Sequence, residues 1–551
     1  MNMKLQEEKN VARKAAPTRN FSSYAYYGLI VLIILLFAYI RFRLRDMPLE
    51  RDEGEYAYAG QLILQGIPPY QLAYNMKLPG TYTAYALILA VFGQSPAAIH
   101  LGLLLINAAT TLLVYFLGRR LSGQLAGVVA AAAYALLSAG PSVLGLAGHA
   151  THFVVLPALG GILLLLKAID ARRTQQFFWS GLLFGVAFVM KQPGIFFLLF
   201  AALYILKTEW KRPVNWAGLA RRMGSLLAGA ALPCALTCAV LLAAGVFKAF
   251  WFWTFSYAGQ YAATLSLADG LGILGDMMPF VAQPAILVWI IAIVGISALF
   301  WNRELRAHSI FIAGFTVFSF LAVCPGFYFR GHYFILMLPA VALLTGIAVG
   351  SATQVARAHP MTQGLVFLPV ILFIGAFLAS VNQQRAFFFA MTPTDVCRAI
   401  YNENPFPEAL PIANYLAANT PADARIAVLG SEPEIYFYSR RHSASGYIYM
   451  YPLMEEQKYA MTMQKEMIGE IEHANPKFLV LVGVQYSWLA PPQSPQLDSL
   501  SSWFERYVNG RYDLTGIADI IGPSQTEYRW GDQAKTYVPQ SPNLIRIFKR
   551  N

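Results

Sequence analysis

The chain has 551 residues, of which 57% are hydrophobic and 13% are charged, and its formal net charge is +12. The charged share is about half that of an ordinary soluble domain, so many apolar residues must face something other than water. These values exclude most water-soluble folds and favour a basic membrane protein. Because no basic tract is interleaved with aromatic residues, we do not expect nucleic acid as a partner.

A polar N-terminal tail, residues 1–23, precedes the first long apolar run at residues 24–40. The tail carries five lysines and arginines (Lys4, Lys9, Arg13, Lys14, Arg19), and no small-residue cleavage site follows the apolar run. We therefore expect an uncleaved membrane anchor and a cytoplasmic tail.

Further apolar runs bring the expected total to about eleven membrane-spanning helices within residues 24–381. They lie near residues 97–118, 124–140, 152–168, 177–190, 193–207, 224–246, 279–300, 309–325, 332–350 and 363–381. With a cytoplasmic N-terminus, the alternation of spans places the basic segments inside, as the positive-inside rule requires: Arg119/Arg120, Arg172/Arg173, 207–222, Arg303/Arg306 and Arg357. Arg41, Arg43 and Arg45 conflict with this rule, because they flank the outer end of the first span.

Three outward segments are too long to be simple turns: residues 41–96, residues 247–278 and the C-terminal segment 382–551. The aromatic run at 250–261 favours interfacial anchoring, with a lipid or sugar groove as the alternative. The C-terminal segment lacks a span-length apolar run and predicts an extracytoplasmic α/β domain with a small mixed sheet. Its predicted elements are a helix near 408–419, a strand at 425–430, a helix near 455–473, a strand at 477–482 and LIRIF near the end.

The first outward loop, residues 41–96, has two amphipathic stretches. The first predicts a helix at 53–65 that ends at Gly66, and the second, 82–92, is too short to span and is expected in the interface. Asp52, with Glu55 three residues later, is close to a helix-capping box, which is one reading of this pair. Capping does not explain why Asp52, Glu53 and Glu55 crowd together in a chain so poor in acids. A capping carboxylate would also be a well-oriented base.

Several motifs together carry a resemblance to a known family. RDEGEYAYAGQLILQGIPPY and KLPG resemble the first outer loop of the GT-C superfamily of membrane glycosyltransferases, and MKQPG, HYFILMLPA and GSEPEIYF are further matches in order. The most similar branch contains protein O-mannosyltransferases and bacterial aminoarabinose transferases. The resemblance implies a polytopic helical fold with an outer C-terminal domain, in a bacterial cytoplasmic (inner) membrane, with that domain periplasmic or extracellular.

The resemblance also implies an activity: transfer of a sugar from a polyprenyl phosphate donor to a lipid, glycan or protein acceptor at the outer face of the membrane. The family's catalytic aspartate falls on Asp52, and Glu53 is the second choice. Such a transfer needs a base for the acceptor but no strict general acid, because a phosphate monoester leaves as a stable anion; we expect inversion at the anomeric carbon. Relatives often carry an acid just before the Lys-Pro element, where this chain has Asn75 and Met76.

Cations at the outer boundary are scarce, and a few of them are expected to meet around the phosphate. The expected phosphate-binding residues are Lys77, Lys191, Arg330, His332 and Tyr333, and the expected substrate-binding residues are Tyr56, Glu55, His149 and His152. Each cation also has a plainer reading as an exposed loop lysine, a snorkelling lysine or part of an aromatic belt. His149 and His152 lack an obvious third ligand, so we predict no metal site and no required cofactor, and the need for a divalent metal stays open.

Two other classes of protein compete with the enzyme. A transporter or flippase of lipid-linked sugars usually buries ionisable residues at mid-membrane, whereas here the spans are almost free of acids and the acids cluster in an outer loop. A non-catalytic assembly or anchoring protein would leave the segment from Asp52 to Lys77 without a purpose. The pattern favours chemistry at the membrane surface.

Overall fold

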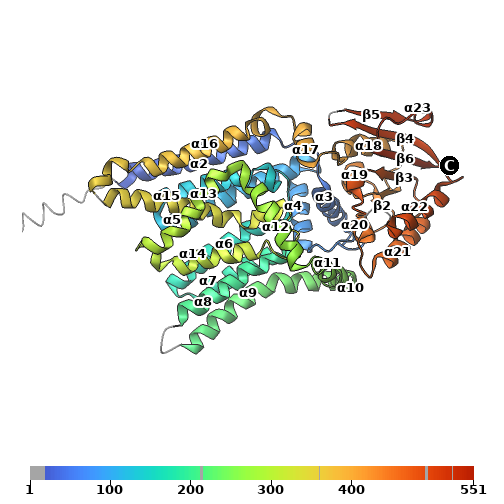
Figure 1. Ribbon diagram of the computed structural model, residues 1–551. Coiled ribbons are helices and arrows are strands. Elements are labelled where there is room, and N and C mark those ends of the chain that lie inside the picture. Colours follow the sequence, from blue (N-terminus) through green and yellow to red (C-terminus); the bar gives the residue numbers. More distant parts are fainter. Residues whose placement is uncertain (1–18, 211–214, 359, 491–493, 524) are drawn as a thin grey trace, which may run out of the picture.

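Long apolar helices form one end of the molecule and a mixed β-sheet forms the other (Figure 1). The computed structural model describes residues 19–210, 215–358, 360–490, 494–523 and 525–551. Residues 1–18 of the predicted cytoplasmic tail lie outside the described residues.

The helical part runs from α2 to α16. Its α-helices are α2 (Arg19–Arg43), α3 (Arg51–Leu64), α4 (Pro79–Phe92), α5 (Pro96–Leu137), α6 (Ala150–Ala171), α7 (Thr174–Met190), α8 (Ile195–Glu209), α9 (Trp216–Ala243), α10 (Phe247–Trp251), α11 (Ala258–Ala262), α12 (Leu267–Ala282), α13 (Ile286–Trp301), α14 (Ser309–Leu321), α15 (Leu338–Ala358) and α16 (Leu368–Gln383). Short 3₁₀ segments join them: η1 (Pro141–Val143), η2 (Gln192–Gly194), η4 (Gln283–Ala285), η5 (Leu305–Ala307), η6 (Gly331–Leu336) and η7 (Pro360–Leu365). Two segments are π-helical, η3 (Phe252–Tyr257) and η8 (Ala386–Ala390).

Within the described residues, seven helical segments are long and apolar enough to cross a membrane. One of them, α5, contains two of the predicted spans, because non-helical dihedrals at Ser122 and Gly123 break its 42 residues into two arms. The predicted spans at 177–190, 193–207 and 309–325 correspond to the shorter helices α7, α8 and α14. The protein is therefore a multi-pass membrane protein.

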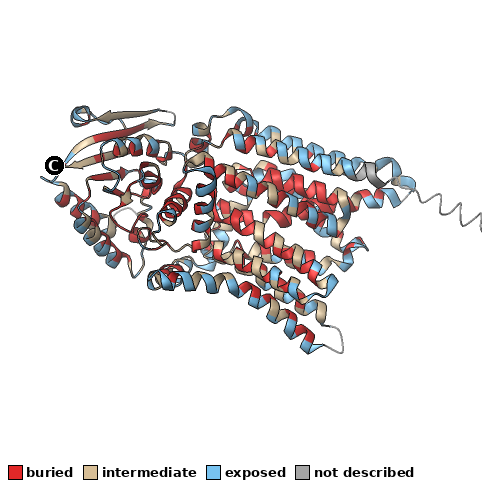
Figure 2. Ribbon diagram, turned by 180° about the vertical axis from the view of Figure 1, so that it is seen from behind, coloured by how far each residue is buried: buried red, intermediate tan, exposed pale blue. Residues whose placement is uncertain are grey.

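The outer helices of the bundle expose apolar side chains. Leu35 on α2, Ile293 on α13 and Leu372 on α16 are each at least 60% exposed, whereas the residues of α5, α6 and α15 are mostly buried. Figure 2 shows the same arrangement, with buried residues in the centre of the bundle and exposed ones along its outer helices. Apolar side chains on such an outer surface are in contact with lipid.

Arg41 and Arg43, which conflict with the positive-inside rule, have structural partners. Arg41 is 6% exposed and donates to the carbonyls of Ser138 and Gly145, at 2.9 and 2.8 Å. Arg43 donates to the carbonyls of Phe387, Phe388 and Met391, at and just after the π-helix η8. These carbonyls lie where helices end and lack helical partners, so the two arginines satisfy them rather than mark a cytoplasmic loop.

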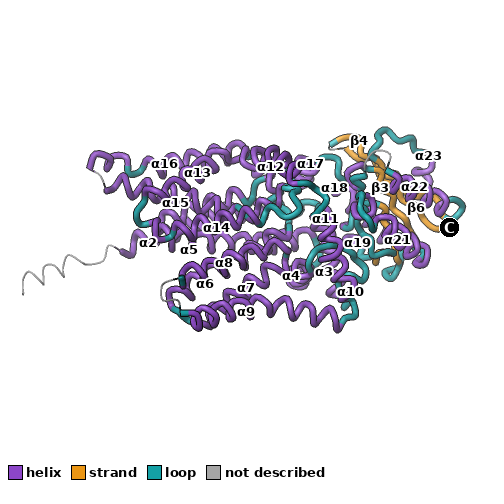
Figure 3. Tube along the Cα trace, turned by 60° about the horizontal axis from the view of Figure 1, so that its bottom comes forward, coloured by secondary structure: helices purple, strands orange, loops and turns teal. Residues whose placement is uncertain are grey.

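Helices α3 and α4 lie between the bundle and the sheet (Figure 1), where many of the connecting loops also gather (Figure 3). The predicted cap of α3 at Asp52 is wrong. The N-cap is Glu50, whose side chain accepts the backbone N–H of Glu53 at 2.9 Å, while the Glu53 side chain accepts the N–H of Glu50. The helix therefore begins at Arg51, and Asp52 lies in its first turn with its carboxylate free for other contacts.

Two glycines allow α3 to pack closely on both sides. A Cβ at Gly54 would lie 2.6 Å from the backbone nitrogen of Glu434, and one at Gly60 would lie 2.9 Å from the backbone nitrogen of Ala86 on α4. The amphipathic pattern of the sequence indicated one buried face. Instead most of α3 is buried, because the C-terminal domain covers the face that α4 and the bundle leave open.

The C-terminal part contains a six-stranded mixed sheet in the order β2-β1-β3-β6-β4-β5. Strands β1 to β3 pair in parallel, and β3, β6, β4 and β5 pair antiparallel. The strands are β1 (Arg425–Leu429), β2 (His442–Ser443), β3 (Phe478–Gly483), β4 (Tyr512–Gly522), β5 (Gln525–Trp530) and β6 (Leu544–Arg550). The helices are α17 (Pro393–Tyr401), α18 (Phe406–Ala418), α19 (Glu434–Ser439), α20 (Tyr451–Met454), α21 (Ala460–Ala474), α22 (Pro495–Val508) and α23 (Asp532–Thr536), with a 3₁₀ turn η9 (Gln485–Ser487).

The sequence prediction of a helical membrane domain with a small mixed α/β domain is confirmed. The predicted strands at 425–430, at 477–482 and in LIRIF correspond to β1, β3 and β6. The prediction missed β4 and β5, because Gly516 and a register shift interrupt the alternation of apolar and polar residues in β4.

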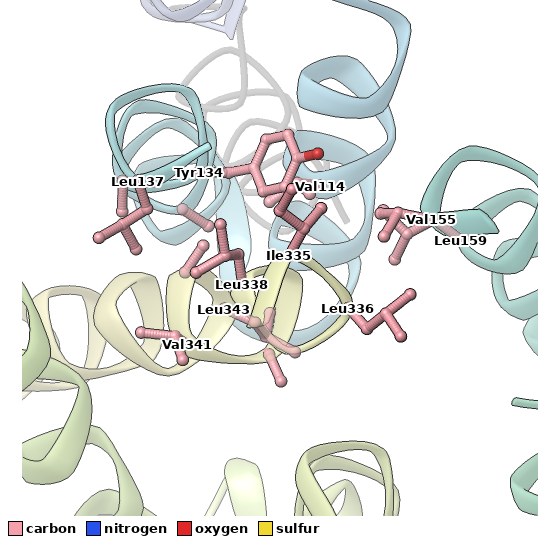
Figure 4. Packing of buried hydrophobic residues seen from close by; sticks show 14 of the residues in the cluster. Val114, Tyr134, Leu137, Val155, Leu159, Ile335, Leu336, Leu338, Val341 and Leu343 are labelled. Atoms are coloured by element: carbon pink, nitrogen blue, oxygen red, sulfur yellow. The ribbon is translucent and has the colours of Figure 1, made fainter. Parts of the chain in front are cut away.

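A tightly packed core supports the outer loops from below. Ile335 and Leu336 of η6 and Leu338 of α15 pack with residues of α5 and α6 in one buried cluster (Figure 4). The predicted span at 332–350 thus begins with a buried 3₁₀ turn, and the α-helix starts only at Leu338. Residues 330–333, just before this core, are consequently held in place at the outer end of the bundle.

Candidate active site

A cavity of about 570 Å³ lies where the outer loops meet the C-terminal domain. Most of its lining residues come from five parts of the chain: α3 with the loop after it, the α7–α8 turn, the segment from η3 to α11, the segment from the end of α14 into η6, and the segment around α20. The lining residues that carry polar groups of interest are Asp52, Tyr56, Lys77, Lys191, Tyr257, Tyr261, Arg330, His332, Tyr333, Tyr449, Tyr451 and Glu455.

Asp52 is the carboxylate of this cavity with the strongest contacts. Its Oδ1 accepts hydrogen bonds from Lys77 Nζ and from Tyr449 Oη, both at 2.7 Å. Its Oδ2 has His149 Nδ1 at 3.7 Å. Burial is the largest influence and raises the pKa of Asp52, but the Lys77 ammonium and the nearby His149 together more than offset it and hold the pKa well below its usual value. Asp52 is therefore ionised and oriented, with Oδ2 left for a substrate.

Glu53 and Glu55 belong to the framework around Asp52 rather than to the cavity wall. Glu53 is fully buried, and its Oε1 accepts the backbone N–H of Gly148 at 2.5 Å and lies 3.1 Å from His100 Nε2. Glu55 is also fully buried and pairs with Lys77 at 2.7 Å, while Tyr82 donates to its other oxygen. Neither carboxylate lines the cavity, so the geometry leaves Asp52 as the accessible acid of α3.

Asn75 stands where relatives often carry an acid, and in this structure it is hydrogen-bonded to an acid of α3. Asn75 donates to Glu55 Oε2 at 2.7 Å, the same oxygen that Lys77 contacts. The second carboxylate at Lys77 is thus supplied by Glu55 from α3, while residue 75 supplies a neutral donor. Lys77 makes two short ion pairs and lies 4.7 Å from the centre of the Tyr56 ring, so its charge is already balanced.

Lys191 and Arg330 differ from Lys77. Within the described residues neither side chain makes a hydrogen bond to protein or an ion pair. Lys191 Nζ lies over the ring of Tyr333, 4.1 Å from its centre, and Arg330 projects into the cavity with its guanidinium 5.7 Å from the centre of the Tyr328 ring. Burial lowers the pKa of Lys191 to about 7. Lys191 and Arg330 line the same cavity and neither has an ion-pair partner, so together they are suited to bind an anion.

Close backbone packing brings these residues together. A Cβ at Gly80 would lie 2.3 Å from the carbonyl oxygen of Val189, and Gln192 donates to the carbonyl of Met76 at 3.0 Å. The segment of Lys77 is thereby fixed to that of Lys191. The loop before Arg330 has positive φ at Gly326, Phe327 and Phe329, an uncommon conformation for non-glycine residues, which turns the chain sharply before Arg330.

The histidines are arranged differently from the expected pair. His149 stacks on His332, with ring centres 4.1 Å apart, and of these residues His332 lines the cavity whereas His149 and His152 do not. Burial and the neighbouring His149 hold the pKa of His332 well below its usual value, so His332 adds no positive charge for a phosphate. Ligand atoms of Asp52, His149 and His332 lie within 4.8 Å of one another and could hold a metal ion.

Sequence reasoning missed the contribution of the C-terminal domain. Tyr449, Tyr451 and Glu455 line the cavity from this domain, and Tyr449 contacts Asp52 directly. Arg51 fixes the domain to α3, because it donates to the carbonyl of Ser431 at 2.5 Å and pairs with Glu432 at 3.1 Å. The GSEPEIYF motif therefore docks the domain, and the following IYMYP stretch, with its closely spaced tyrosines, was the available signal for the site.

Comparisons with known proteins agree with this architecture. The family model described as dolichyl-phosphate-mannose-protein mannosyltransferase matches residues 79–228. A search of curated proteins finds no significant match. The solved structure of ArnT from Cupriavidus metallidurans bound to undecaprenyl phosphate is similar with a TM-score of 0.58 and 15% identity, over 95% of this chain and 98% of that chain.

Two structures of the Archaeoglobus fulgidus oligosaccharyltransferase are also similar. AglB in complex with an inhibitory peptide and a dolichol-phosphate has a TM-score of 0.51 and 12% identity, over 95% of this chain and 76% of that chain. The enzyme tethered to an acceptor peptide containing the NVT sequon has a TM-score of 0.50 and 13% identity, over 93% and 74%.

The chain shares the fold of ArnT and AglB, so the fold predicted from the sequence motifs is confirmed, and a protein mannosyltransferase family model matches part of the helical region. Its architecture is similar to that of ArnT over nearly the full length of both chains.

Proposed function

We propose that this protein is an inverting glycosyltransferase that moves a sugar from a polyprenyl phosphate donor to a lipid, glycan or protein acceptor at the outer face of a bacterial cytoplasmic membrane. One observation carries the proposal: a single cavity contains an oriented, ionised carboxylate, Asp52, and two cations without anionic partners, Lys191 and Arg330. A base and an anion site at the same cavity are what this transfer requires.

Asp52 acts as the base. Lys77 and Tyr449 both engage its Oδ1, which leaves Oδ2 to accept the proton of an acceptor hydroxyl. As the acceptor oxygen bonds to the anomeric carbon, the bond from that carbon to the phosphate oxygen breaks on the opposite face. A carboxylate of low pKa suffices, because the hydroxyl becomes strongly acidic only as its bond to the sugar forms.

Lys191 and Arg330 hold the leaving phosphate, and Tyr333 keeps Lys191 in place through its ring. Polyprenyl phosphate departs as a stable anion whose charge the two cations balance, so no proton donor is needed. Among known structures of this fold, ArnT was solved with undecaprenyl phosphate and AglB with a dolichol-phosphate, which supports a polyprenyl phosphate as the carrier here.

We propose that the transfer needs no cofactor, since protein cations supply the positive charge. If a divalent cation were required, Asp52, His149 and His332 are the described residues that would hold it. Transfer that survives treatment with EDTA supports the cofactor-free proposal. Loss of transfer that Mg²⁺, Mn²⁺ or Zn²⁺ restores would contradict this proposal and leave these three residues as the candidate ligands.

The deciding experiment uses the purified full chain in liposomes, with radiolabelled undecaprenyl phosphate sugars and envelope extracts as acceptors. We expect release of undecaprenyl phosphate and label in a new product. Movement of the labelled lipid across the bilayer without a product would favour the transporter alternative.

A further inference from the structure

A second carboxylate lines the cavity from the C-terminal domain. Glu455 follows α20, and its Oε2 accepts a hydrogen bond from Tyr257 Oη at 2.7 Å. Tyr257 belongs to the π-helix η3 of the second outer loop, so the pair joins two parts of the chain that are 198 residues apart. Within the described residues no cation forms an ion pair with Glu455, and its other oxygen is available to the cavity. The transfer proposed above gives this pair no role.

Arg330 lies within electrostatic range of both carboxylates of the cavity, Asp52 and Glu455. A phosphate held by Arg330 would therefore have the base near one side and the Glu455–Tyr257 pair within reach of the group attached to it. On a glycosyl donor that group is the sugar to be transferred. The position of Glu455 beside the phosphate site favours contact with the donor sugar over contact with a distant part of the acceptor.

The chemistry of the pair suits a hydroxylated ring. A carboxylate accepts hydrogen bonds from neighbouring hydroxyls. The Tyr257 hydroxyl donates its hydrogen bond to Glu455, so its oxygen can still accept one from the sugar. Tyr261 and Tyr328, which also line the cavity, stack with ring centres 4.5 Å apart and offer an apolar surface for the C–H groups of a sugar. A lipid tail would leave the Glu455 carboxylate without a partner, which is unfavourable.

We propose that Glu455 and Tyr257 form the recognition site for the hydroxyls of the transferred sugar, and that they determine which sugar the enzyme accepts. The inference rests on the proposed glycosyl transfer and goes beyond it by assigning sugar specificity to the junction of the C-terminal domain and the second outer loop. Glu455 is thus a specificity residue, separate from the base and from the phosphate site.

The test compares Glu455→Gln with Glu456→Gln in the full-length protein. Glu456 is the exposed neighbour outside the cavity, so its variant makes the same change of charge without touching the pair. A glutamine at 455 can still accept the Tyr257 hydrogen bond, which preserves the junction. The probes are undecaprenyl phosphate itself and undecaprenyl phosphate linked to glucose, galactose, mannose or arabinose.

We expect Glu455→Gln to raise the KM of the preferred donor about 10-fold or more, since hydrogen bonds to a charged group are lost. Discrimination between sugars that differ at one hydroxyl should fall with it. The affinity for bare undecaprenyl phosphate and the KM of the acceptor should stay the same, as should all values for Glu456→Gln. Tyr257→Phe should show a smaller rise in donor KM.

Unchanged donor KM and unchanged sugar preference in Glu455→Gln would overturn the inference, and so would a rise confined to the acceptor KM. If the wild-type protein transfers none of the four sugars, the proposed function fails for these donors. The inference is then decided by binding: Glu455→Gln must lower the affinity for at least one sugar-bearing lipid relative to undecaprenyl phosphate. An unchanged ratio for all four lipids would overturn it.

Discussion

Two walls of the cavity carry its cations, and the cations of the two walls differ in whether they have anionic partners. On the wall formed by α3 and the loop after it, Lys77 is paired with Asp52 and with Glu55, which lies behind the wall. On the wall formed by the α7–α8 turn and the loop before η6, Lys191 and Arg330 have no anionic partner among the described residues.

The difference separates a preorganised group from a binding site. Short ion pairs and the Tyr449 hydrogen bond fix the direction of Asp52, as a base requires. An unpaired cation that is partly buried is costly, and the pKa of Lys191, lowered by burial to about 7, reflects that cost. A bound phosphate would remove this cost by supplying the missing negative charge. The paired wall is thus complete without substrate, while the cationic wall becomes balanced only when the donor binds.

Replacing the base should have the largest effect. Asp52→Asn retains an oxygen for Lys77 and Tyr449 but cannot take a proton, so we expect transfer to fall by about 10²- to 10⁴-fold while expression and folding are unchanged. The measurement is product formation by the purified variant in liposomes. Asp46→Asn, at an exposed position outside the cavity, is the matched control and should transfer normally. Full activity in a well-folded Asp52→Asn protein would refute the assignment.

Removing a cation from the other wall should act on donor binding. Arg330→Ala and Lys191→Ala should each weaken the binding of undecaprenyl phosphate by about 10- to 100-fold, the range expected for a lost charged hydrogen bond. Lys248→Ala removes an exposed cation that does not line the cavity and should bind as the wild type does. If both cavity variants bound undecaprenyl phosphate as tightly as the wild type, Lys77 would remain as the phosphate ligand. The two walls would then not differ in function.

The pH dependence of binding sharpens the same contrast. Lys191 is charged below its pKa of about 7 and neutral above it, so undecaprenyl phosphate should bind more weakly as the pH rises above 7, by up to about 10-fold per pH unit. Glu50, whose pKa burial and the nearby Asp52 raise to about 7, ionises in the same range. Lys191→Arg separates the two groups, because arginine stays charged while Glu50 is unchanged. A fall of equal size in this variant would assign the dependence to Glu50.

The sequence predicted the helical class, the C-terminal α/β domain, and Asp52, Lys77, Lys191 and Arg330 as candidates. Hydrophobic periodicity and basic doublets reveal spans, and a rare charge in an apolar chain stands out. Which charges pair could not be predicted, because pairing depends on contacts between distant segments, such as Lys77 with Glu55 or Arg51 with Glu432.

The histidines and tyrosines illustrate the same limit. The three-residue spacing indicated His149 with His152, but the partner of His149 is His332 from another outer loop. Tyr449 and Glu455 were missed because their role depends on where the C-terminal domain docks, and local pattern carries no information on docking. Arg41 and Arg43 misled the topology rule for a related reason, since carbonyls far along the chain bind them.

Disturbing the contact between α3 and the C-terminal domain should have the smallest effect on activity. It tests whether docking of the domain keeps Asp52 in its fixed orientation. A Cβ in Gly54→Ala would lie 2.6 Å from the backbone nitrogen of Glu434 and 2.7 Å from its Cβ, and backbone atoms cannot move aside cheaply. The cost of such overpacking is about 1–3 kcal/mol. We expect a lower melting temperature and a few-fold loss of transfer as Asp52 loses its fixed direction, with the affinity for undecaprenyl phosphate unchanged. Gly224→Ala, where nothing lies within 4 Å of the added Cβ, is the control. A wild-type melting temperature for Gly54→Ala would mean that the domain does not brace α3, and the rigidity of Asp52 would then have to come from Lys77 and Glu55 alone.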